Sequence, residues 1–411
     1  MRLYEDAQAV IAAALKAAQP DEAVRKALSG LSFSQTGKLV LVAIGKAAWQ
    51  MADAAVKLLG GVINDGIVIT KYGHAQGELP PLRIWEAGHP VPDQNSFDAT
   101  EEAIGMVKNL GEDDTVVFLI SGGGSALFEK PLIPGAELEN ITRQLLACGA
   151  DIVEMNTIRK RLSSVKGGRF AQICAPARVI SVVLSDIIGD PLDMIASGPA
   201  YPDSSTAAQA MAIVKKYRLQ LSAEAENLLL QETPKSLTNV ETHITGSVRQ
   251  LCRSAEEACA RLGYKPLVLT ASLSCTARDA GSFLASIAQY HATSDTSLAF
   301  IAGGETVVRL TGSGLGGRNQ EIALSAATGI SGLRDTAVFS LGSDGTDGPT
   351  DAAGGYCDDT TLTRLSAIGI DAAAVLDDND SYHALEKVNG LIKTGPTGTN
   401  VNDISVLLIR R

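Results

Sequence analysis

The sequence is poor in aromatic, histidine and cysteine side chains, and each shortage excludes something. Aromatic residues make up only 4% of the 411 residues, so Ala, Val, Leu and Ile must fill the hydrophobic core. The six cysteines form no C-x-x-C pair and the five histidines form no H-E-x-x-H pair. These absences argue against zinc, a disulfide framework and histidine-based metal catalysis. Free thiols in a reducing cytosol are the plain interpretation.

Long apolar runs and an excess of basic residues are also missing. The longest apolar runs, such as 116–120 and 179–184, are far too short to cross a membrane. Acidic residues near the N-terminus argue against a secretory signal, and residues 4–18 predict an amphipathic helix. The formal net charge of −11 argues against nucleic acid as a partner, although a local basic cluster would still bind an anion. We therefore predict a cytoplasmic protein without a membrane partner.

Short apolar runs alternate with helical patterns along the whole chain. This rhythm predicts an α/β fold with mostly parallel, doubly wound sheets, and the length favours two domains. The polar stretch 233–242 is the best linker, which gives domains 1–235 and 236–411. The predicted strands are residues 38–44, 67–70, 83–86, 115–120, 178–184, 266–270, 298–302, 305–310, 337–341 and 405–409.

Nearly every predicted strand runs directly into a glycine-rich or polar loop. Ligands of open α/β sheets bind at the carboxyl ends of strands, so this bias predicts an active site. Ser121-Gly122-Gly123-Gly124-Ser125 has three glycines that let backbone N–H groups approach a phosphate or carboxylate. A tight strand-to-helix turn is the alternative interpretation of this loop. Lys46 stands at another strand-to-helix junction, where the helix dipole disfavours a cation unless an anion is present.

Carboxylates cluster in two further loops. Asp186 and Asp190 follow one predicted strand, and Asp344 and Asp347 follow another. Such clusters suit Mg²⁺, which takes one or two carboxylates together with phosphate oxygens. Asx turns and helix caps are the alternative explanation for each of these residues.

Two basic features complete the set of candidates. Lys166 and Arg169 belong to a basic island at 159–169, which is either a solvated helix face or a pair of cations for an anionic ligand. The loop 312–317 fits G-x-G-x-x-G, but the acid that a dinucleotide site needs near the end of the next strand is poorly spaced, because Asp344 lies well past the usual ~20 residues. Arg318 follows at once, at the mouth of that loop, where it would suit an anion.

Taken together, these motifs resemble the bacterial glycerate 2-kinases, which have an N-terminal glycerate kinase domain and a C-terminal MOFRL domain. The resemblance spans nearly the whole chain in family order, and the MOFRL region would cover about 297–405. The matching runs are residues 43–48, 86–93, 121–126, 184–190, 195–199, 303–306, 314–321, 342–351 and 394–403.

The resemblance implies transfer of the γ-phosphoryl group of ATP, with Mg²⁺, to the 2-hydroxyl of D-glycerate. It also implies two three-layer α/β/α domains with the active site in the cleft between them. D-glycerate and ATP would be the partners, and a homodimer is compatible with the sequence. The implied roles are catalysis by Lys46, Asp186 and Arg318, substrate or phosphate binding by Ser121, Gly122, Gly123, Gly124, Ser125, Lys166, Arg169, Glu305 and Asn319, and metal binding by Asp190, Asp344 and Asp347.

Two other functions compete with the kinase. Some relatives carry the name hydroxypyruvate reductase, and the G-x-G-x-x-G match superficially supports an NAD(P) enzyme. The badly spaced acid and the absence of an evident His–acid or Tyr–Lys pair argue against it. A non-catalytic sensor of glycerate or nucleotide is the third hypothesis, although it would need fewer charged residues at strand ends.

Overall fold

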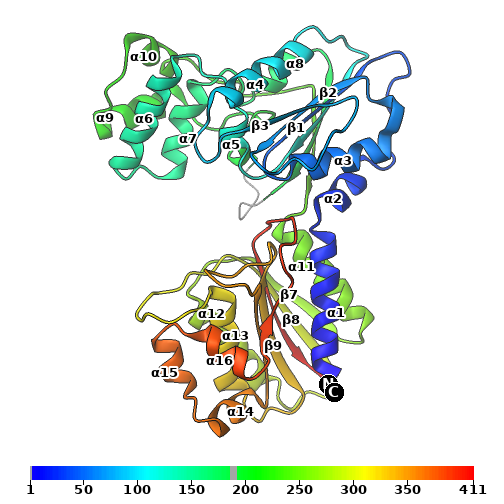
Figure 1. Cartoon of the computed structure of the whole chain (residues 1–411), viewed down its shortest axis with the longest axis vertical. Coiled ribbons are helices and arrows are strands. Elements are labelled where there is room, and N and C mark those ends of the chain that lie inside the picture. Colours follow the sequence, from blue (N-terminus) through cyan, green and yellow to red (C-terminus); the bar gives the residue numbers. More distant parts are fainter. Residues whose placement is uncertain (1, 186–191) are drawn as a thin grey trace. The chain divides into compact units, whose positions relative to one another are not determined.

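The computed structural model describes residues 2–185 and 192–411, which form two compact units (Figure 1). One unit contains residues 23–185 and 192–245, and the other contains residues 2–22 and 246–411. Each unit is built on its own 6-stranded sheet, which confirms the predicted α/β class. Within the described ranges, no helix has both the length and the apolar character needed to span a membrane.

The sheet of the first unit is parallel throughout. Its strand order is β3-β2-β1-β4-β5-β6, a doubly wound arrangement with β1 at the centre. All residues of β1 and β4 are buried, as expected for strands covered on both faces. The strands are β1 (Leu39–Ile44), β2 (Asp65–Lys71), β3 (Arg83–Ala87), β4 (Thr115–Ile120), β5 (Arg178–Leu184) and β6 (Val240–Thr245).

Helices cover this sheet and also form a separate bundle beside it. Three of the few aromatic side chains, Phe118, Phe128 and Phe170, meet in the core under the sheet, with ring centroids 4.8–5.8 Å apart. A second apolar cluster joins α6, α7, α9 and α10. The helices are α2 (Pro20–Leu28), α3 (Ala48–Leu59), α4 (Gln94–Val107), α5 (Gly124–Leu127), α6 (Gly135–Ala147), α7 (Ile152–Arg161), α8 (Arg169–Cys174), α9 (Ala207–Tyr217) and α10 (Ala223–Leu229).

The sheet of the second unit is mixed. Its order is β11-β10-β9-β12-β8-β7, and β7 and β8 are its one parallel pair, while β12 lies antiparallel between β8 and β9. The prediction of a parallel sheet therefore describes the first unit better than the second. The strands are β7 (Lys265–Leu273), β8 (Leu298–Gly304), β9 (Thr336–Gly342), β10 (Gly354–Asp358), β11 (Leu391–Ile392) and β12 (Asp403–Ile409). The predicted strand at 305–310 is wrong, because that segment forms only an isolated bridge at Val307.

Helices lie on both faces of the second sheet, which gives three layers (Figure 1). Helices α12 and α13 pack closely because Gly281 allows a close approach: a Cβ there would lie 2.4 Å from the carbonyl oxygen of Ile322. Helices α1 and α11 cover the other face. The helices are α1 (Arg2–Ala17), α11 (Val248–Arg261), α12 (Ala277–Tyr290), α13 (Arg318–Ile330), α14 (Thr361–Ala367), α15 (Ala372–Asp377) and α16 (Ser381–Lys387).

The division of the chain differs from the predicted boundary after residue 235. Strand β6 belongs to the first sheet, although it lies beyond that boundary. The N-terminal helix α1 belongs to the second unit, where Asp6 accepts a hydrogen bond from the hydroxyl of Tyr264 at 2.6 Å. The sequence offers no pattern that reports this long-range contact, so the domain of α1 could be assigned only from the fold.

Candidate active site

The first candidate region lies at the carboxyl ends of β1 and β4. Strand β1 stands between β2 and β4, so the chain leaves it on opposite sides, and ligands of open α/β sheets bind at such a reversal. The register pairs Ile44 with Ile120, which brings Lys46 beside the loop 121–125. The backbone N–H of Lys46 donates to the carbonyl of Gly122 at 2.9 Å. Lys46 and the glycine loop, both predicted from the sequence, therefore lie together.

The hydroxyl of Ser121 joins these two strand ends. It accepts a hydrogen bond from the N–H of Ala47 at 3.1 Å and donates one to the carbonyl of Ile44 at 3.2 Å. Gly45 has a φ of 111°, and a Cβ on it would lie 2.3 Å from the Ser121 Oγ. Ser121 thus holds the loop in place, whereas the sequence predicted that it binds an anion.

Two ionisable side chains, those of His89 and Lys46, lie against Gly123. A Cβ on Gly123 would lie 3.1 Å from the ring of His89 and 3.2 Å from the Cγ of Lys46. Burial and then the charge of Lys46 lower the pKa of His89, so its imidazole is neutral at pH 7. The Lys46 side chain is exposed, and its ammonium group has no hydrogen-bond or ion-pair partner among residues 2–185 and 192–411.

The other end of the loop is organised by a chain of hydroxyl groups. Ser125 Oγ lies 3.0 Å from the Oγ of Ser197, which donates to the Oδ1 of Asn156 at 2.9 Å. Because Ser197 uses its proton on Asn156, Ser125 donates to Ser197 and keeps its own lone pairs as acceptors. Helix α5, which begins at Gly124, has only 4 residues, so it adds little helix dipole to the loop.

Lys166 does not face a ligand. Its Nζ donates to the carbonyls of Ser125 at 2.9 Å and Phe128 at 2.8 Å, and it lies 3.1 Å from the Oε2 of Glu129. Two donors of the ammonium group therefore bind backbone carbonyls, and its charge is paired with Glu129. Burial lowers the pKa of Lys166 to about 8. The structure therefore differs from the predicted substrate-binding role and places Lys166 as a support beneath the glycine loop.

Arg169 also points into the protein. Its Nη1 donates to the carbonyls of Lys160, Arg161 and Ser163, where helix α7 ends and needs donors for its last carbonyls. Burial and then the charge of Arg161 lower the pKa of Arg169. Arg169 thereby caps α7, and its role in anion binding stays a prediction.

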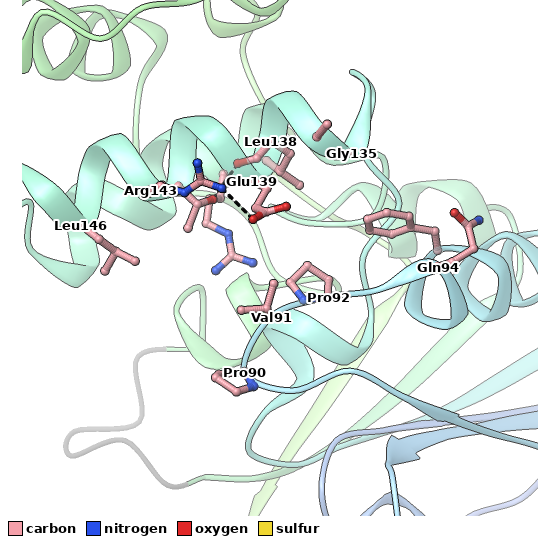
Figure 2. Close-up of a pocket in the computed structure, with 13 residues that line it drawn as sticks. Pro90, Val91, Pro92, Gln94, Gly135, Leu138, Glu139, Arg143 and Leu146 are labelled. Atoms are coloured by element: carbon pink, nitrogen blue, oxygen red, sulfur yellow. Dashed lines mark hydrogen bonds and ion pairs between the residues drawn. The ribbon is translucent and has the colours of Figure 1, made fainter.

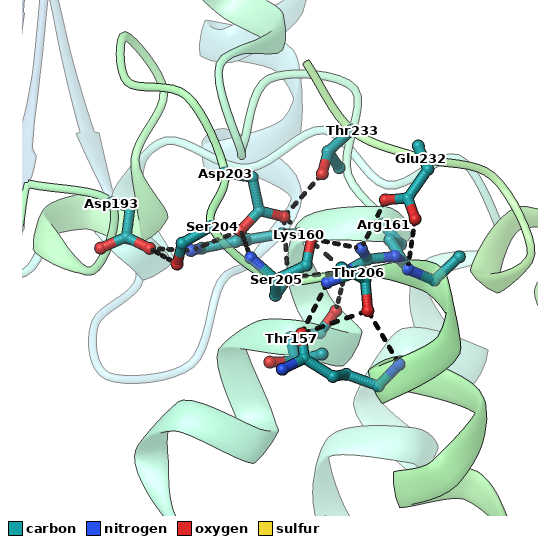
Figure 3. Close-up of polar contacts among 12 residues, drawn as sticks. Thr157, Lys160, Arg161, Asp193, Asp203, Ser204, Ser205, Thr206, Glu232 and Thr233 are labelled. Carbon is teal, nitrogen blue, oxygen red and sulfur yellow. Dashed lines mark hydrogen bonds and ion pairs between the residues drawn. The ribbon is translucent and has the colours of Figure 1, made fainter. Parts of the chain in front are cut away.

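The rest of the basic island is a buried network of ion pairs (Figure 3). Lys160 lies 3.1 Å from Asp203, and Arg161 lies 3.2 Å from Glu232 and donates to the hydroxyl of Ser205 at 2.8 Å. Lys160 and Arg161 are almost completely buried. The island is therefore neither a solvated helix face nor a pair of free cations, because acidic residues distant in the sequence neutralise it.

The second candidate region lies at the carboxyl ends of β8 and β9. Because β12 is antiparallel to both strands, its first residue, Asp403, pairs with Gly304 at the end of β8 and with Gly342 at the end of β9. Glu305 and Asp344, which follow these strands closely, reach the same edge. A Cβ on Gly342 would lie 3.4 Å from the Oδ1 of Asp344 and 3.5 Å from the Oδ1 of Asp403.

Arg318, the first residue of α13, is held between two of these carboxylates. Its Nε and Nη2 donate to both oxygens of Asp403 at 2.5 and 3.0 Å, and its Nη1 donates to Glu305 at 2.8 Å. Burial opposes the charge of Arg318, but the contacts with Asp403 and Glu305 raise its pKa. Burial raises the pKa of Asp403 to about 6 even though the Arg318 charge lowers it.

Asp347 and Asn319 organise the start of α13. The carboxylate of Asp347 accepts from the backbone N–H groups of Asn319 at 3.1 Å and Gln320 at 2.9 Å, and the Asn319 amide donates to it at 3.2 Å. Ser340 donates to the Asn319 Oδ1 at 2.6 Å. Burial raises the pKa of Asp347. Asp347 therefore caps a helix, which differs from its predicted role as a metal ligand, and Asn319 connects buried groups instead of facing a substrate.

Among the predicted metal ligands in the described part of the chain, Asp344 is the one whose surroundings best suit a metal ion. Its Oδ1 accepts from the N–H and hydroxyl of Thr346, and its Oδ2 has no such partner in the described part of the chain. No group of three or more His, Cys, Asp or Glu side chains suited to a metal exists within residues 2–185 and 192–411. Mg²⁺ bound to phosphates needs only one or two carboxylates, and the pair Asp344 and Asp403 meets that requirement.

The loop 312–317 is filled by the protein itself. A Cβ would lie 2.3 Å from Asp378 if placed on Gly312, 2.4 Å from Asp380 on Gly314, and 2.2 Å from Asp347 on Gly317. These glycines therefore allow close packing of the loop against residues 378–381 and Asp347. No β-strand precedes the loop, so the context that a dinucleotide site requires is absent from this described segment.

Two of the predicted residues, Asp186 and Asp190, lie outside the described residues. Sequence reasoning passed over two residues, one in each candidate region. His89 occurs in a glycine loop after a strand, a signal that the sequence did offer. Asp403 is the first residue of β12, so a search of loops that follow strands could not find it.

Comparisons with known proteins agree along the whole chain. Residues 6–230 match a family model described as a domain of unknown function, DUF4147, and residues 298–403 match the MOFRL family. A D-glycerate 2-kinase of Thermotoga maritima is 49% identical over 97% of both chains. A putative hydroxypyruvate reductase of Agrobacterium vitis is 40% identical over 91% of this chain and 100% of its own. A crystal structure of glycerate kinase from Thermotoga maritima has a TM-score of 0.93, with 48% identity and 99% of both chains covered.

Proposed function

The chain belongs to the glycerate 2-kinase family, and from that premise we propose that it transfers the γ-phosphoryl group of ATP to the 2-hydroxyl of D-glycerate. The products are 2-phosphoglycerate and ADP. The observation that carries the proposal is the exposed ammonium group of Lys46 beside the glycine loop at the reversal point of the first sheet. A cation with no partner among the described residues, next to bare backbone, is suited to a phosphate or carboxylate.

In this proposal Lys46 neutralises charge on the transferring phosphoryl group or on the glycerate carboxylate. Phosphoryl transfer depends on positioning and on neutralising the charge of the phosphoryl oxygens. The neutral His89 beside Lys46 leaves the ammonium group as the local charge. The backbone of Gly122, Gly123 and Gly124 contributes N–H groups, while Ser121 and Lys166 keep that backbone in place.

Arg318 supplies the second cation. A guanidinium has five N–H donors, and Arg318 uses three of them on Asp403 and Glu305. The remaining donors point from a side chain whose orientation is fixed by two carboxylates, which is how an arginine is prepared to stabilise a phosphoryl group at low entropic cost. Asp403 and Glu305 are therefore positioning residues in this proposal, and Arg318 is the catalytic residue.

Mg²⁺ would be held by Asp344, with Asp403 beside it, and would neutralise phosphate charge when bound. Asp186 remains the proposed acceptor of the proton from the substrate hydroxyl, and Asp190 remains a proposed second metal ligand. ATP is the donor, and the compartment we propose is the cytoplasm, in keeping with six free cysteines. A homodimer is the oligomeric state to test by light scattering.

The reductase name of some relatives is the one observation that favours another activity. The packing of the loop 312–317 argues against it, because residues 378–381 occupy the space where a dinucleotide would approach the glycines. A nicotinamide cofactor would also need an acid near the end of the following strand to bind its ribose, and Asp344 lies well past the usual ~20 residues. We therefore prefer the kinase.

The test is a pair of parallel assays with the full chain. One contains D-glycerate, ATP and Mg²⁺ and follows ADP release, and the other contains hydroxypyruvate and NADH and follows NADH oxidation. We expect ADP release that depends on glycerate, with ³¹P NMR identifying 2-phosphoglycerate as the product. NADH oxidation without ADP release would replace the kinase by the reductase, and silence in both assays would favour a sensor.

A further inference from the structure

A cavity of about 570 Å³ lies in the first unit, between the segment that follows His89 and helix α6 (Figure 2). Figure 2 shows Val91 and Pro92 facing Leu138, Glu139 and Arg143 of that helix. The volume lies within the range of about 300–1,000 Å³ that is usual for small-molecule sites. None of the roles proposed above uses this cavity.

Two of its walls are attached to the glycine loop. Pro90 lines the cavity and follows His89, whose ring lies against Gly123. Arg159 lines it from α7 and donates its Nη2 to the carbonyl of Ser125 at 3.2 Å. Pro90 and Arg159 therefore connect the cavity to the surroundings of the glycine loop, although residues 121–125 do not line it.

The side chains that line the cavity indicate which part of a ligand would bind there. Val91, Phe97, Leu138 and Leu146 give the cavity apolar walls, and Val91 and Leu146 are 59% and 62% exposed at its rim. Glycerate is a small and fully polar acid, which would gain little from these surfaces. A flat purine would bury its faces against them, as aromatic ligands do in apolar pockets.

Two arginines supply charge complementary to a nucleotide. The Arg159 side chain is 13% exposed, and its Nε is a buried donor without a partner in the described chain. Arg143, which also lines the cavity, forms an ion pair with the exposed Glu139 at 2.8 Å. A buried donor without a partner destabilises the protein, so a ligand that offers an acceptor to the Arg159 Nε would gain binding free energy. From this geometry we propose that the cavity binds the purine nucleoside of the phosphoryl donor, with its phosphates directed toward the glycine loop.

This inference rests on the proposed kinase activity, and its test separates the two. The variant is Leu146→Trp, which fills the rim of the cavity from an exposed position. Ile152→Trp is the matched control, because Ile152 is also 62% exposed and does not line the cavity. We expect Leu146→Trp to raise the KM for ATP by about tenfold or more, because it removes the apolar contacts of the base. The KM for D-glycerate and the kcat should stay within about twofold in both variants.

A second measurement uses two probes, one that carries only the phosphates of the nucleotide and one that carries only its nucleoside. Inorganic tripolyphosphate carries the phosphates alone, so its inhibition constant against ATP should be the same in wild type and Leu146→Trp. Adenosine binding, measured by calorimetry, should be lost in Leu146→Trp and kept in Ile152→Trp. This binding experiment needs no turnover, so it reports on the cavity even if the kinase assay fails.

Three results would overturn the nucleoside site. The first is an unchanged KM for ATP in Leu146→Trp with normal turnover, which leaves the kinase intact. The second is a rise in the KM for D-glycerate alone, which would assign the cavity to the acceptor. The third is failure of adenosine to bind the wild-type protein.

Discussion

The Lys46 region and the Arg318 region present two different cations. Lys46 projects from a parallel sheet into a space bordered by glycines and a neutral histidine, and its ammonium group has no partner in the described chain. Arg318 is held by Asp403 and Glu305 at the edge of a mixed sheet. One cation is exposed and unpaired, and the other is oriented in advance by carboxylates. An exposed, unpaired lysine has little effect on the stability of the fold and gains an ion pair when an anion binds. An arginine between two carboxylates is already oriented before the ligand binds.

A contrast of the same kind separates these cations from the basic island. Lys166 and Arg169 looked like ligand-binding residues in the sequence, but both spend their donors on backbone carbonyls. A cation can therefore bind a ligand only if some of its N–H donors are not already bound to other protein groups. The following variants test which of these cations act on the ligand and which stabilise the fold.

Arg318→Ala should have the largest effect. Loss of the oriented guanidinium should lower kcat by about 10³-fold, in the range found for arginines that stabilise phosphoryl groups. Steady-state kinetics with ATP and D-glycerate measure it. Arg334→Ala is the control, since Arg334 is 80% exposed and paired only with its neighbour Asp335. Near-normal turnover in Arg318→Ala would remove this residue from the catalytic set.

Lys46→Ala should lower kcat by about 10²-fold, the usual loss when one preorganised charge is removed from a site. Because the side chain is exposed, the melting temperature should hardly change. Lys57→Ala, which removes an exposed lysine of α3, is the control. A large drop in melting temperature with an intact kcat would make Lys46 a structural residue and break the comparison with Arg318.

Lys166→Met should affect stability more than catalysis, the opposite of Lys46→Ala. It leaves Glu129 buried without its close partner, which should cost about 3 kcal/mol of unfolding free energy. Urea denaturation measures the loss, and the KM values of the remaining folded enzyme should rise only modestly, as far as the glycine loop loses its support. The double variant Lys166→Met with Glu129→Gln should recover part of the stability. A raised KM with normal stability would restore the predicted ligand-binding role.

Asp403→Asn tests how Arg318 is positioned. Burial raises the pKa of Asp403 to about 6, so the kcat of the wild type should fall below that pH as the carboxylate is protonated and Arg318 loses its partner. The variant should have a lower kcat at neutral pH and should lack this acid limb. A pH–rate profile that keeps a limb near pH 6 in Asp403→Asn would assign the titration to another group.

The same pKa predicts a stability change of defined sign. The folded value lies above the ordinary value of 3.8, so the folded chain holds this proton to higher pH than the unfolded chain does. The contribution of Asp403 to stability is therefore present below pH 4 and lost as the pH rises to about 6. The difference in unfolding free energy between Asp403→Asn and wild type should shift by up to about 3 kcal/mol in favour of the variant across that range.

Local sequence patterns predicted much of the fold and part of the site. The apolar runs at 38–44 and 115–120 became buried parallel strands, and the loops after them met as Lys46 and 121–125. This was predictable because side-chain burial and glycine loops are properties of a few adjacent residues. The strand at 305–310 failed because its apolar residues find only one bridging partner in the fold.

The sequence by itself determined the α/β class, the glycine loops at strand ends and the family of the protein. Only the tertiary structure decided which charged side chains keep donors for a ligand. Lys166, Arg169 and Asp347 are satisfied by partners contributed by the fold, and Asp403 reaches the site because β12 runs antiparallel between two strands that end there. The reason is physical: a buried polar group takes whichever partner the fold brings within hydrogen-bond reach, and that partner is usually distant in the sequence.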